Sequence, residues 1–408
     1  MKCRHCGSPV HLPFLDLGSA PPSNSYLTAD AMRLPEKWFP LKVLVCEGCW
    51  LVQTEDYAHF ADLFSADYAY FSSFSSSWLQ HAENYVEQMI NRYGLDEKSN
   101  VVEVAANDGY LLQFVRQRGV PCLGVEPTAS TAKAARDKGI PIVEEFFGVG
   151  LAKKLVQDGH SADLTVANNV LAHVPDIDDF VAGFAELLKP SGISTFEFPH
   201  LLKQVQENQF DTVYHEHFSY LSLTAVQRIF EKNGLTVTDV EELSTHGGSL
   251  RVHAQRQDCP NLQVSPRVDA MCAHERACGV STREFYLAFQ EKAIKVKNDL
   301  LLFLLDAKRN GKRVAAYGAA AKGNTLLNYA GVKSDLVEFV VDRNPAKQGK
   351  WLPGSRIPVV AESALAVSKP DFILILPWNL KAEVVEQLSY ARGFGARFVS
   401  AVPTLQIL

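Results

Sequence analysis

The stretch Asn100-Val-Val-Glu-Val-Ala-Ala-Asn-Asp-Gly109 decides the fold. Its apolar run predicts a buried parallel strand, and the Asn-Asp-Gly at its end predicts a tight turn into a helix over residues 110–118. A second strand, Cys122-Leu-Gly-Val-Glu126, ends in an acid. This order predicts the nucleotide-binding half of a doubly wound α/β sheet, in which the acid accepts hydrogen bonds from ribose hydroxyls.

Two further apolar segments extend this sheet. Asp163-Leu-Thr-Val-Ala-Asn168 and Gly192-Ile-Ser-Thr-Phe-Glu-Phe198 each predict a strand, and Asn169-Val-Leu-Ala-His-Val-Pro-Asp176 lies between them. The order resembles that of class I S-adenosylmethionine-dependent methyltransferases, in which a Val-Leu-x-His-Val-Pro-Asp stretch recurs after the fourth strand. The resemblance implies a Rossmann-like domain that binds S-adenosylmethionine.

The turn departs from the glycine-rich form of dinucleotide sites. Ala105 stands where the first glycine commonly falls, and Asn107-Asp-Gly109 completes the turn. A dinucleotide needs closely packed backbone amides around its pyrophosphate, whereas S-adenosylmethionine carries no phosphate, so the turn favours the latter. We expect the cofactor to contact this turn and the neighbouring strand ends, namely Glu103, Ala105, Asn107, Asp108, Gly109, Tyr110, Leu111, Glu126, Pro127, Asn168 and Asn169.

Length and composition restrict the class of protein. A chain of 408 residues predicts two or three domains, and a formal net charge of -6 argues against a broad basic face for nucleic acid. No apolar run approaches the roughly eighteen residues of a membrane span, and the N-terminus lacks the apolar core of a signal peptide. We therefore expect a cytoplasmic protein with neither nucleic acid nor membrane as a partner.

Four of the eight cysteines form two Cys-x-x-Cys pairs, Cys3 with Cys6 and Cys46 with Cys49. Two such pairs predict a tetrahedral Zn²⁺ site, which is structural because a fully ligated Cys₄ site has no open position. The proline- and glycine-rich segment between them predicts loop and short strand that zinc folds. Four unconnected thiols are the alternative, and His5 could in principle replace one ligand. The other cysteines show no metal-like pairing: Cys122, Cys259, Cys272 and Cys278.

The stretch Asp211-Thr-Val-Tyr-His-Glu-His217 is rich in reactive side chains. It follows the predicted strand 192–198 at the sheet edge where doubly wound folds bind ligands. Tyrosine, histidine and glutamate could supply a general base, a group that orients it and a donor for an oxyanion. Methylation of a carbon next to a ketone needs these groups, because a C–H proton must leave and the enolate must be held. A polar strand or loop whose histidines bond to the backbone is the alternative.

A second α/β unit is predicted near the C-terminus. Apolar residues at helical spacing predict a long connecting helix over about 281–310, and Arg313-Val-Ala-Ala-Tyr317 predicts a strand after it. The turn Gly318-Ala-Ala-Ala-Lys-Gly323 at a helix N-terminus suits a phosphate group, with Lys322 available. Strands are also predicted over 336–342, which ends in Asp342, and over 372–378. The repeated architecture predicts two nucleotide pockets, one for each ligand.

The segment His246-Gly-Gly-Ser-Leu-Arg-Val252 joins a glycine turn to a strand. It offers backbone amides, a hydroxyl and a guanidinium to an anion or to a sugar hydroxyl. A plain hairpin turn is the alternative reading of the two glycines.

Five motifs in order resemble the sugar C-methyltransferase family, whose members methylate nucleotide-linked deoxy-keto-sugars. They are the first Cys-x-x-Cys pair, Glu103-Val-Ala-x-Asn-Asp-Gly-Tyr-Leu-Leu112, Tyr214-His-Glu-His-Phe218, His246-Gly-Gly-Ser-Leu-Arg251 and Tyr317-Gly-Ala-x-Ala-Lys-Gly-Asn324. The resemblance covers nearly the whole chain. It implies an N-terminal zinc module, a central methyltransferase domain and a C-terminal Rossmann-like domain that helps to hold the sugar nucleotide.

Carried over by position, the resemblance assigns roles to the site residues. His217 would be the general base, Tyr214 would assist at the keto oxygen, and Glu216 would be a further polar catalytic residue. Tyr68 and Tyr70 would close over the substrate, although a packed linker helix explains them equally well. The other residues expected to contact substrate are His215, His246, Gly247, Gly248, Ser249, Arg251, Tyr317, Ala319, Lys322, Gly323, Asn324 and Asp342.

These observations together predict three domains. We expect a zinc-binding module at 1–65, a methyltransferase domain at 66–280 with a linker helix at 66–95, and a Rossmann-like domain at 281–408. The predicted activity is S-adenosylmethionine-dependent C-methylation of a nucleotide-diphosphate keto-sugar by a monomer or weak oligomer. A nicotinamide-dependent sugar-nucleotide oxidoreductase or epimerase, or a non-catalytic zinc-knuckle binding protein, is the alternative.

Overall fold

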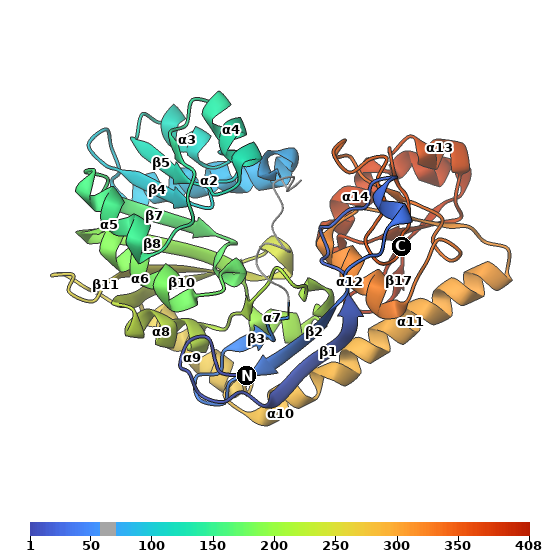
Figure 1. The fold of residues 1–408 in the computed structure, drawn as a ribbon, viewed down its shortest axis with the longest axis horizontal. Coiled ribbons are helices and arrows are strands. Elements are labelled where there is room, and N and C mark those ends of the chain that lie inside the picture. Colours follow the sequence, from blue (N-terminus) through green and yellow to red (C-terminus); the bar gives the residue numbers. More distant parts are fainter. Residues whose placement is uncertain (58–70) are drawn as a thin grey trace.

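The protein is described by a computed structural model for residues 1–57 and 71–408. It contains sheets of four, seven and six strands. Figure 1 shows the seven-stranded sheet on the left, the six-stranded sheet on the right and the N-terminal strands below and between them. The expected α/β architecture, with a small N-terminal module and two Rossmann-like units, is confirmed.

The N-terminal sheet is antiparallel and contains β1 (Leu12–Ala20), β2 (Phe39–Val45) and β3 (Val52–Thr54). Its fourth strand, β9 (Ser219–Tyr220), comes from the middle of the chain and pairs with β3. The apolar side chains of β1 and β2 share one hydrophobic core with the C-terminal part of the chain. The expectation that zinc alone folds this module is therefore incomplete, because hydrophobic packing also holds its strands.

The seven-stranded sheet has the order β10-β11-β8-β7-β4-β5-β6. Five strands run parallel, so their carboxyl ends meet at one edge of the sheet, where such folds bind ligands. These strands are β4 (Val101–Val104), β5 (Cys122–Val125), β6 (Ile142–Val143), β7 (Ala162–Asn168) and β8 (Leu188–Pro199). Two antiparallel strands complete the sheet, β10 (Leu235–Leu243) and β11 (Ser249–Arg256).

Helices cover this sheet and bury its apolar side chains, as a parallel sheet requires. The helix predicted over 110–118 is shorter than expected, because the turn extends to Leu111. The helices are α2 (Ser76–Tyr93), α3 (Leu112–Gln117), α4 (Ala129–Asp137), α5 (Val149–Gln157), α6 (Ile177–Leu187), α7 (Leu201–Gln206), α8 (Leu223–Lys232) and α9 (Pro266–Ala277).

The six-stranded sheet has the order β14-β13-β12-β15-β16-β17, and all its pairings are parallel except the last. The strands are β12 (Val314–Tyr317), β13 (Val340–Val341), β14 (Val359–Val360), β15 (Phe372–Ile375), β16 (Arg397–Ser400) and β17 (Gln406–Ile407). The helices are α12 (Ala321–Ala330), α13 (Ala364–Ser368) and α14 (Lys381–Gln387). Two predicted strands, 336–342 and 372–378, are thus shorter than expected.

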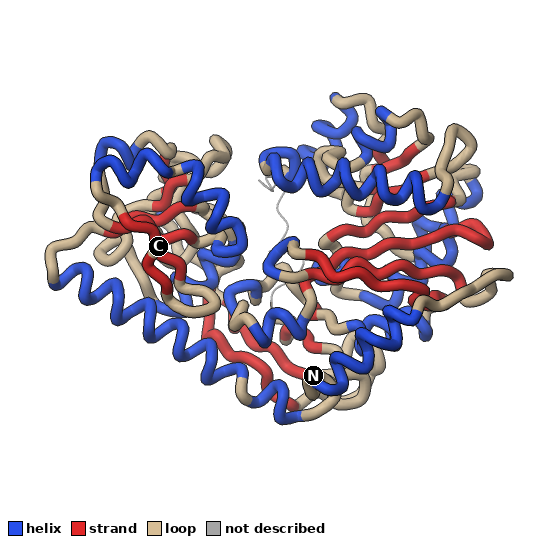
Figure 2. Tube along the Cα trace, turned by 180° about the vertical axis from the view of Figure 1, so that it is seen from behind, coloured by secondary structure: helices blue, strands red, loops and turns tan. Residues whose placement is uncertain are grey.

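The predicted connecting helix is interrupted. It forms α10 (Arg283–Leu287) and α11 (Phe289–Arg309), which meet at Ala288, where the N–H bonds to Tyr286 instead of continuing one helix. In Figure 2, α11 runs past the N-terminal strands to the six-stranded sheet. The helix therefore ties the first and last domains together.

Within residues 1–57 and 71–408, none of the helices has both the length and the apolar run needed to cross a membrane.

Candidate functional site

The four cysteine sulfurs of the N-terminal module converge. The Sγ atoms of Cys3 and Cys49 are 3.6 Å apart, those of Cys6 and Cys46 are 3.4 Å apart, and all four lie within 4.8 Å of one another. Tetrahedral thiolates at a Zn–S length of about 2.3 Å lie about 3.8 Å apart, so the sulfurs fit one zinc ion. The predicted Cys₄ zinc module is confirmed.

His5 contacts the domain of the seven-stranded sheet. Its Nδ1 lies 2.7 Å from Oδ1 of Asp178 in α6. Lys232 of α8 donates to the carbonyl of His5 and to Asp178, and Arg228 donates to the carbonyl of Gly48 at 2.7 Å. These contacts fasten both zinc knuckles to the second domain, and the four cysteine sulfurs complete the site without His5.

The turn after β4 has the backbone shape of a glycine-rich turn. The φ angles of Ala105, Asn107 and Gly109 are 60°, 49° and 75°, in the left-handed region. A Cβ atom at Gly109 would lie 2.3 Å from Cδ1 of Ile140, so this position requires glycine. Alanine and asparagine hold the other two positions at some cost in strain, which is typical of a ligand-binding turn.

Glu126 sits beside this turn at the end of β5. Its Oε2 accepts from the amide of Asn107 at 3.0 Å, and its Oε1 accepts from the amide of Thr128, beyond Pro127, at 2.9 Å. Each carboxylate oxygen has a second lone pair, and no basic side chain of the described residues pairs with Glu126. The carboxylate can therefore also accept from two ribose hydroxyls, as S-adenosylmethionine requires.

The end of β7 contributes two unsatisfied amides. Oδ1 of Asn168, and both Oδ1 and Nδ2 of Asn169, are buried without a partner among the described residues. Asn169 also has a left-handed φ of 56°. Because buried polar groups normally have hydrogen-bond partners, these atoms fit a polar ligand at the same sheet edge.

The other residues predicted to contact the cofactor lie around the turn. Glu103 and Leu111 are buried in the core, and burial raises the pKa of Glu103 well above its ordinary value. Asp108 accepts from the amide of Ser73 and pairs with Lys138. The ring of Tyr110 stacks on Trp78 with centroids 5.9 Å apart. Glu103 and Leu111 thus contribute support from the core side of the turn.

His217 is held in one tautomer. Its Nδ1 lies 3.0 Å from the carbonyl oxygen of Thr212, and because a carbonyl only accepts, Nδ1 carries the proton. The lone pair is therefore on Nε2. Burial, aided by nearby His173, Lys322 and His246, holds the pKa of His217 well below its usual range, so the ring is neutral at neutral pH.

Two aromatic rings flank His217. The Tyr214 ring lies with its centroid 3.9 Å away, and the His173 ring meets it edge-on at 4.6 Å. Nδ1 of His173 donates to the carbonyl of Glu216 at 2.8 Å, and burial lowers the pKa of His173 to about 4. His173 received no role from the sequence, although its position just after β7 at the ligand-binding edge was a usable signal.

Glu216 and His215 point toward the N-terminal module. Oε1 of the fully buried Glu216 accepts from the amide and the side chain of Asn24, and burial raises the Glu216 pKa to about 7. Nε2 of His215 donates to the carbonyls of Phe39 and Pro40, at 3.2 Å each. His215 therefore anchors β2, and Glu216 is held by Asn24 of the N-terminal module.

The C-terminal domain meets this segment directly. Thr325 of α12 donates to the carbonyl of Val213 at 2.9 Å, and Nε1 of Trp378 donates to Oδ2 of Asp211 at 2.7 Å. Nζ of Lys322 lies 4.7 Å from the centre of the Trp378 ring. No sequence pattern assigns a site role to Asp211 or Trp378, because a single aspartate or tryptophan does not indicate such a contact.

The His-Gly-Gly turn lies against the same tryptophan. A Cβ atom at Gly247 would lie 2.5 Å from Trp378, and one at Gly248 would lie 2.8 Å from Lys203, so glycine is required at both. His246 is buried with a pKa lowered to about 3 by burial. Ser249 donates to the carbonyl of Thr245, within the turn.

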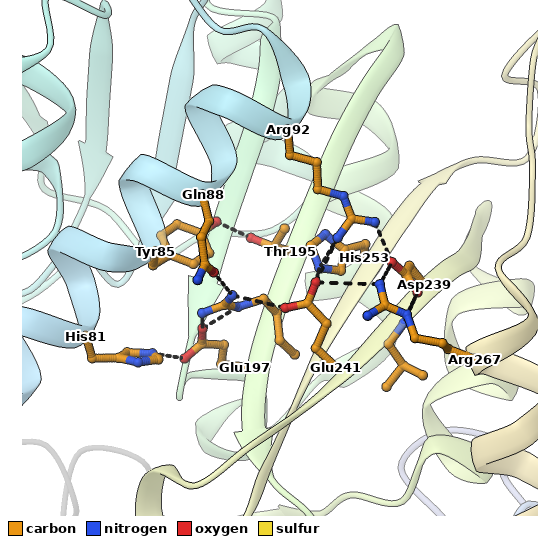
Figure 3. A network of polar contacts seen from close by, with 12 residues as sticks. His81, Tyr85, Gln88, Arg92, Thr195, Glu197, Asp239, Glu241, His253 and Arg267 are labelled. Atoms are coloured by element: carbon orange, nitrogen blue, oxygen red, sulfur yellow. Dashed lines mark hydrogen bonds and ion pairs between the residues drawn. The ribbon is translucent and has the colours of Figure 1, made fainter.

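The guanidinium of Arg251 forms hydrogen bonds within a buried network. Its guanidinium donates to Glu197 at 2.7 Å, to Gln88 at 2.9 Å and to Glu241 at 3.2 Å, and His81 contacts the other oxygen of Glu197. Figure 3 shows how this network ties α2 to strands β8, β10 and β11. The guanidinium of Arg251 therefore helps to hold helix α2, and its contact with substrate stays a prediction.

The predicted C-terminal site residues separate into two groups. Lys322 lies at the boundary with the stretch 211–217, and Asn324 reaches the N-terminal module by donating to the carbonyl of Ser23 at 2.7 Å. Away from this boundary, Tyr317 bonds to Gln387 within the domain. Gly323 packs on Leu376, Ala319 and Asp342 bond to each other, and the predicted Tyr68 and Tyr70 lie outside the described residues.

Three families match the chain in order. Residues 3–64 match the family described as "Putative zinc binding domain", residues 78–240 match "Methyltransferase domain", and residues 244–403 match "C-methyltransferase C-terminal domain". The matches follow the order of the three sheets.

Individual relatives differ in how much of the chain they cover. The C-methyltransferase NovU of Streptomyces niveus is 34% identical over 407 residues, which is 100% of this chain and 96% of the relative. A ubiquinone biosynthesis O-methyltransferase of Histophilus somni is 30% identical over 122 residues, or 28% and 48% of the two chains. The crystal structure of magnesium protoporphyrin IX methyltransferase from Synechocystis PCC 6803 covers 50% of this chain and 86% of that chain, with 15% identity and a TM-score of 0.35.

Proposed function

From the premise that this chain belongs to the C-methyltransferase family, we propose that it methylates a ring carbon next to the ketone of a nucleotide-diphosphate-linked deoxy-keto-sugar. Family membership makes it an S-adenosylmethionine-dependent C-methyltransferase and decides against the nicotinamide-dependent and the non-catalytic alternatives. The sugar nucleotide and the residue roles below are the proposal.

His217 is the general base in this proposal, and its geometry is the observation that carries it. The bond from Nδ1–H to Thr212 leaves the lone pair on Nε2, and burial keeps the ring neutral because its pKa is low. A neutral imidazole of fixed tautomer can accept a C–H proton. The same burial makes the protonated ring costly, so proton transfer depends on groups that stabilise the enolate.

Tyr214 is the donor to the enolate oxygen. Its ring is 3.9 Å from that of His217, so both side chains can reach one substrate carbon and its neighbouring carbonyl. A tyrosine hydroxyl is protonated at neutral pH and donates to a developing oxyanion. Glu216, which is buried beside this pair and has a pKa raised to about 7, is a further polar group of the site.

The cofactor pocket lies at the same sheet edge. S-adenosylmethionine supplies the electrophilic methyl group when bound. Glu126 would hold the ribose hydroxyls, and the turn from Ala105 to Gly109 would lie against the amino-acid part. The unsatisfied amides of Asn168 and Asn169 lie at the end of β7. In the sheet, β7 lies between β4, whose turn forms this pocket, and β8, which leads toward residues 211–217, the catalytic segment of this proposal.

The C-terminal domain would hold the sugar nucleotide. Support comes from the bonds that join α12 and Trp378 to Val213 and Asp211, because they place this domain against the catalytic segment. The N-terminal module would be structural: zinc would hold the two knuckles, which bond to α6 and α8, while Asn24 fixes Glu216.

Exchange of the acidic C–H proton with D₂O tests the proposal. Nucleotide keto-sugars are incubated with S-adenosylhomocysteine and no methyl donor, and loss of the proton is followed by mass spectrometry. We expect wild-type protein to exchange the proton of its substrate, Tyr214→Phe to slow exchange, and His217→Ala to reduce it by about 10² to 10⁴. His274→Ala, at an exposed histidine, is the matched control. Undiminished exchange in His217→Ala would move the base elsewhere.

A further inference from the structure

A set of buried and half-buried polar side chains lies where the methyltransferase and C-terminal domains meet. We call Gln209, Asp211, Lys322 and Trp378 the seam cluster. Gln209 lies just before the stretch 211–217 and Asp211 begins it, whereas Lys322 lies in the first turn of α12 and Trp378 follows β15. Helix α12 packs on the short helix Phe210–Thr212, so the four residues belong to one interface.

Trp378 organises the cluster. Its Nε1 donates to Asp211, and the Lys322 ammonium lies over its ring. The Gly247 backbone packs on the edge of the indole and accepts a hydrogen bond from Gln209 Nε2 at 2.7 Å. Asp211 and Lys322 thus contact the same indole, and each influences the charge of the other without forming an ion pair.

The cluster has unused hydrogen-bonding capacity. Oδ1 of Asp211, Oε1 of Gln209 and Nε2 of His246 are buried without a partner among the described residues. Lys322 uses one donor on Asn379 at 3.2 Å and forms no ion pair with any carboxylate of the described residues. A buried acceptor left unsatisfied costs about 1 to 3 kcal/mol, so this arrangement points to a ligand that supplies the missing partners.

The mixture of an acid and a base indicates what that ligand is. A phosphate group at Lys322 would bring a second anion to the buried Asp211 carboxylate, which has no other cation beside it. A hydroxyl group can accept from Lys322 and donate to Asp211 at the same time. We propose that Asp211 and Lys322 together bind one hydroxyl of the substrate's sugar ring, and that the diphosphate is held elsewhere. This inference rests on the proposed sugar-nucleotide substrate.

The charges of the pair support a neutral partner. Burial raises the pKa of Asp211 to about 7 and lowers that of Lys322 to about 8, and each group moderates the shift of the other. Near neutral pH the pair therefore carries little excess charge of either sign. A hydroxyl completes it without adding an uncompensated charge, whereas a diphosphate does not.

The test compares two ligands, a nucleotide sugar that the wild-type protein methylates and the same nucleoside diphosphate without its sugar. Binding of each is measured by calorimetry with S-adenosylhomocysteine present. In Lys322→Met we expect the nucleotide sugar to bind at least about tenfold more weakly, and the nucleoside diphosphate to change by less than about twofold. Lys308→Met, at an exposed lysine of α11, is the control and should change neither.

Asp211→Asn is the second variant, and it keeps an acceptor for Trp378. We expect the same selective loss for the nucleotide sugar, and we expect a substrate analogue that lacks the recognised hydroxyl to bind both variants as it binds wild type. Unchanged S-adenosylhomocysteine affinity shows that the variants are folded. Should Lys322→Met misfold, Lys322→Gln replaces it.

The outcomes separate this inference from the proposed function. Equal weakening of both ligands in Lys322→Met would place the diphosphate at Lys322 and overturn the inference while leaving the substrate class intact. Unchanged binding of both ligands would also overturn it. If wild-type protein neither binds nor methylates any nucleotide sugar, the proposed function fails, and the inference fails with it.

Discussion

In both Rossmann-like units backbone amides donate to an acid after the second strand, but the surroundings of the two acids differ. In the methyltransferase unit the turn amide of Asn107 and the amide of Thr128 both donate to Glu126, at 3.0 and 2.9 Å. In the C-terminal unit the amides of Ala319 and Asn344 donate to Asp342, at 2.8 Å each. The local geometry therefore supports the predicted duplication of a nucleotide-binding turn.

The surroundings of the two acids differ. Nζ of Lys347 lies 3.5 Å from Asp342 and donates to the carbonyl of Ala319, to which Tyr26 also donates at 2.5 Å. No basic side chain of the described residues pairs with Glu126. One turn thus keeps a carboxylate available to a ribose, while the other is occupied by a lysine of its own domain and a tyrosine of the zinc module. The same backbone turn therefore leaves the acid available to a ligand in one unit and not in the other.

Zinc removal should have the largest effect, because the zinc module contacts both units. Structural zinc sites in small modules contribute about 10 to 16 kcal/mol of apparent binding energy, so chelation or Cys46→Ala should unfold the two zinc knuckles and lower the melting temperature of the whole chain, although the strands β1 and β2 keep their hydrophobic packing. Calorimetry and elemental analysis check this. Folding that survives chelation, with much less than one zinc per chain, would contradict it.

Acid should distinguish the units next. Residues 281–408 contain no histidine, whereas in the methyltransferase unit burial lowers the pKa values of His173 and His246 to about 4 and 3. In the unfolded chain these histidines bind protons below about pH 6.5, whereas in the folded chain they bind them only below about pH 4. The free energy of unfolding therefore falls as the pH drops through this window.

The effect should reach about 1 to 3 kcal/mol per histidine. Urea titrations between pH 7 and 4.5 measure it. His173→Gln should flatten the profile, and hydrogen exchange at low pH should open the seven-stranded sheet before the six-stranded one. A profile that the substitution leaves unchanged would exclude His173 as the titrating group.

Matched substitutions of the two acids should separate their roles. Glu126→Gln should weaken S-adenosylmethionine binding by about 1.5 to 3 kcal/mol, since charge-assisted hydrogen bonds to the ribose are lost. Asp342→Asn should leave that affinity unchanged. Isothermal calorimetry measures both affinities. Equal affinities for wild type and Glu126→Gln would show that Glu126 does not bind the ribose.

The smallest expected effect is at Tyr26. Tyr26→Phe removes one hydrogen bond to Ala319 and should cost about 0.5 to 1.5 kcal/mol of stability, without changing S-adenosylmethionine affinity. Denaturant titration measures the first quantity and calorimetry the second. A loss of cofactor affinity in this variant would show that the turn beside Asp342 affects binding at the turn beside Glu126.

Sequence reasoning succeeded where the signal is local. The paired cysteines, the turn from Ala105 to Gly109 and the acid at Glu126 lie within short segments whose spacing reflects the geometry of one metal ion or one turn. Element ends were less accurate, as the break at Ala288 shows, because a helical periodicity continues across a break that backbone hydrogen bonds decide.

The alternation of strands and helices, the two turn-and-acid pairs and the metal site were therefore determined by the sequence itself. The tertiary structure alone decided that His173 meets His217, that Arg251 bonds to Glu197, that Trp378 reaches Asp211 and that Lys347 pairs with Asp342. Most of these contacts join side chains far apart along the chain. Each side chain has several possible partners, and only the packing of sheets and domains selects one.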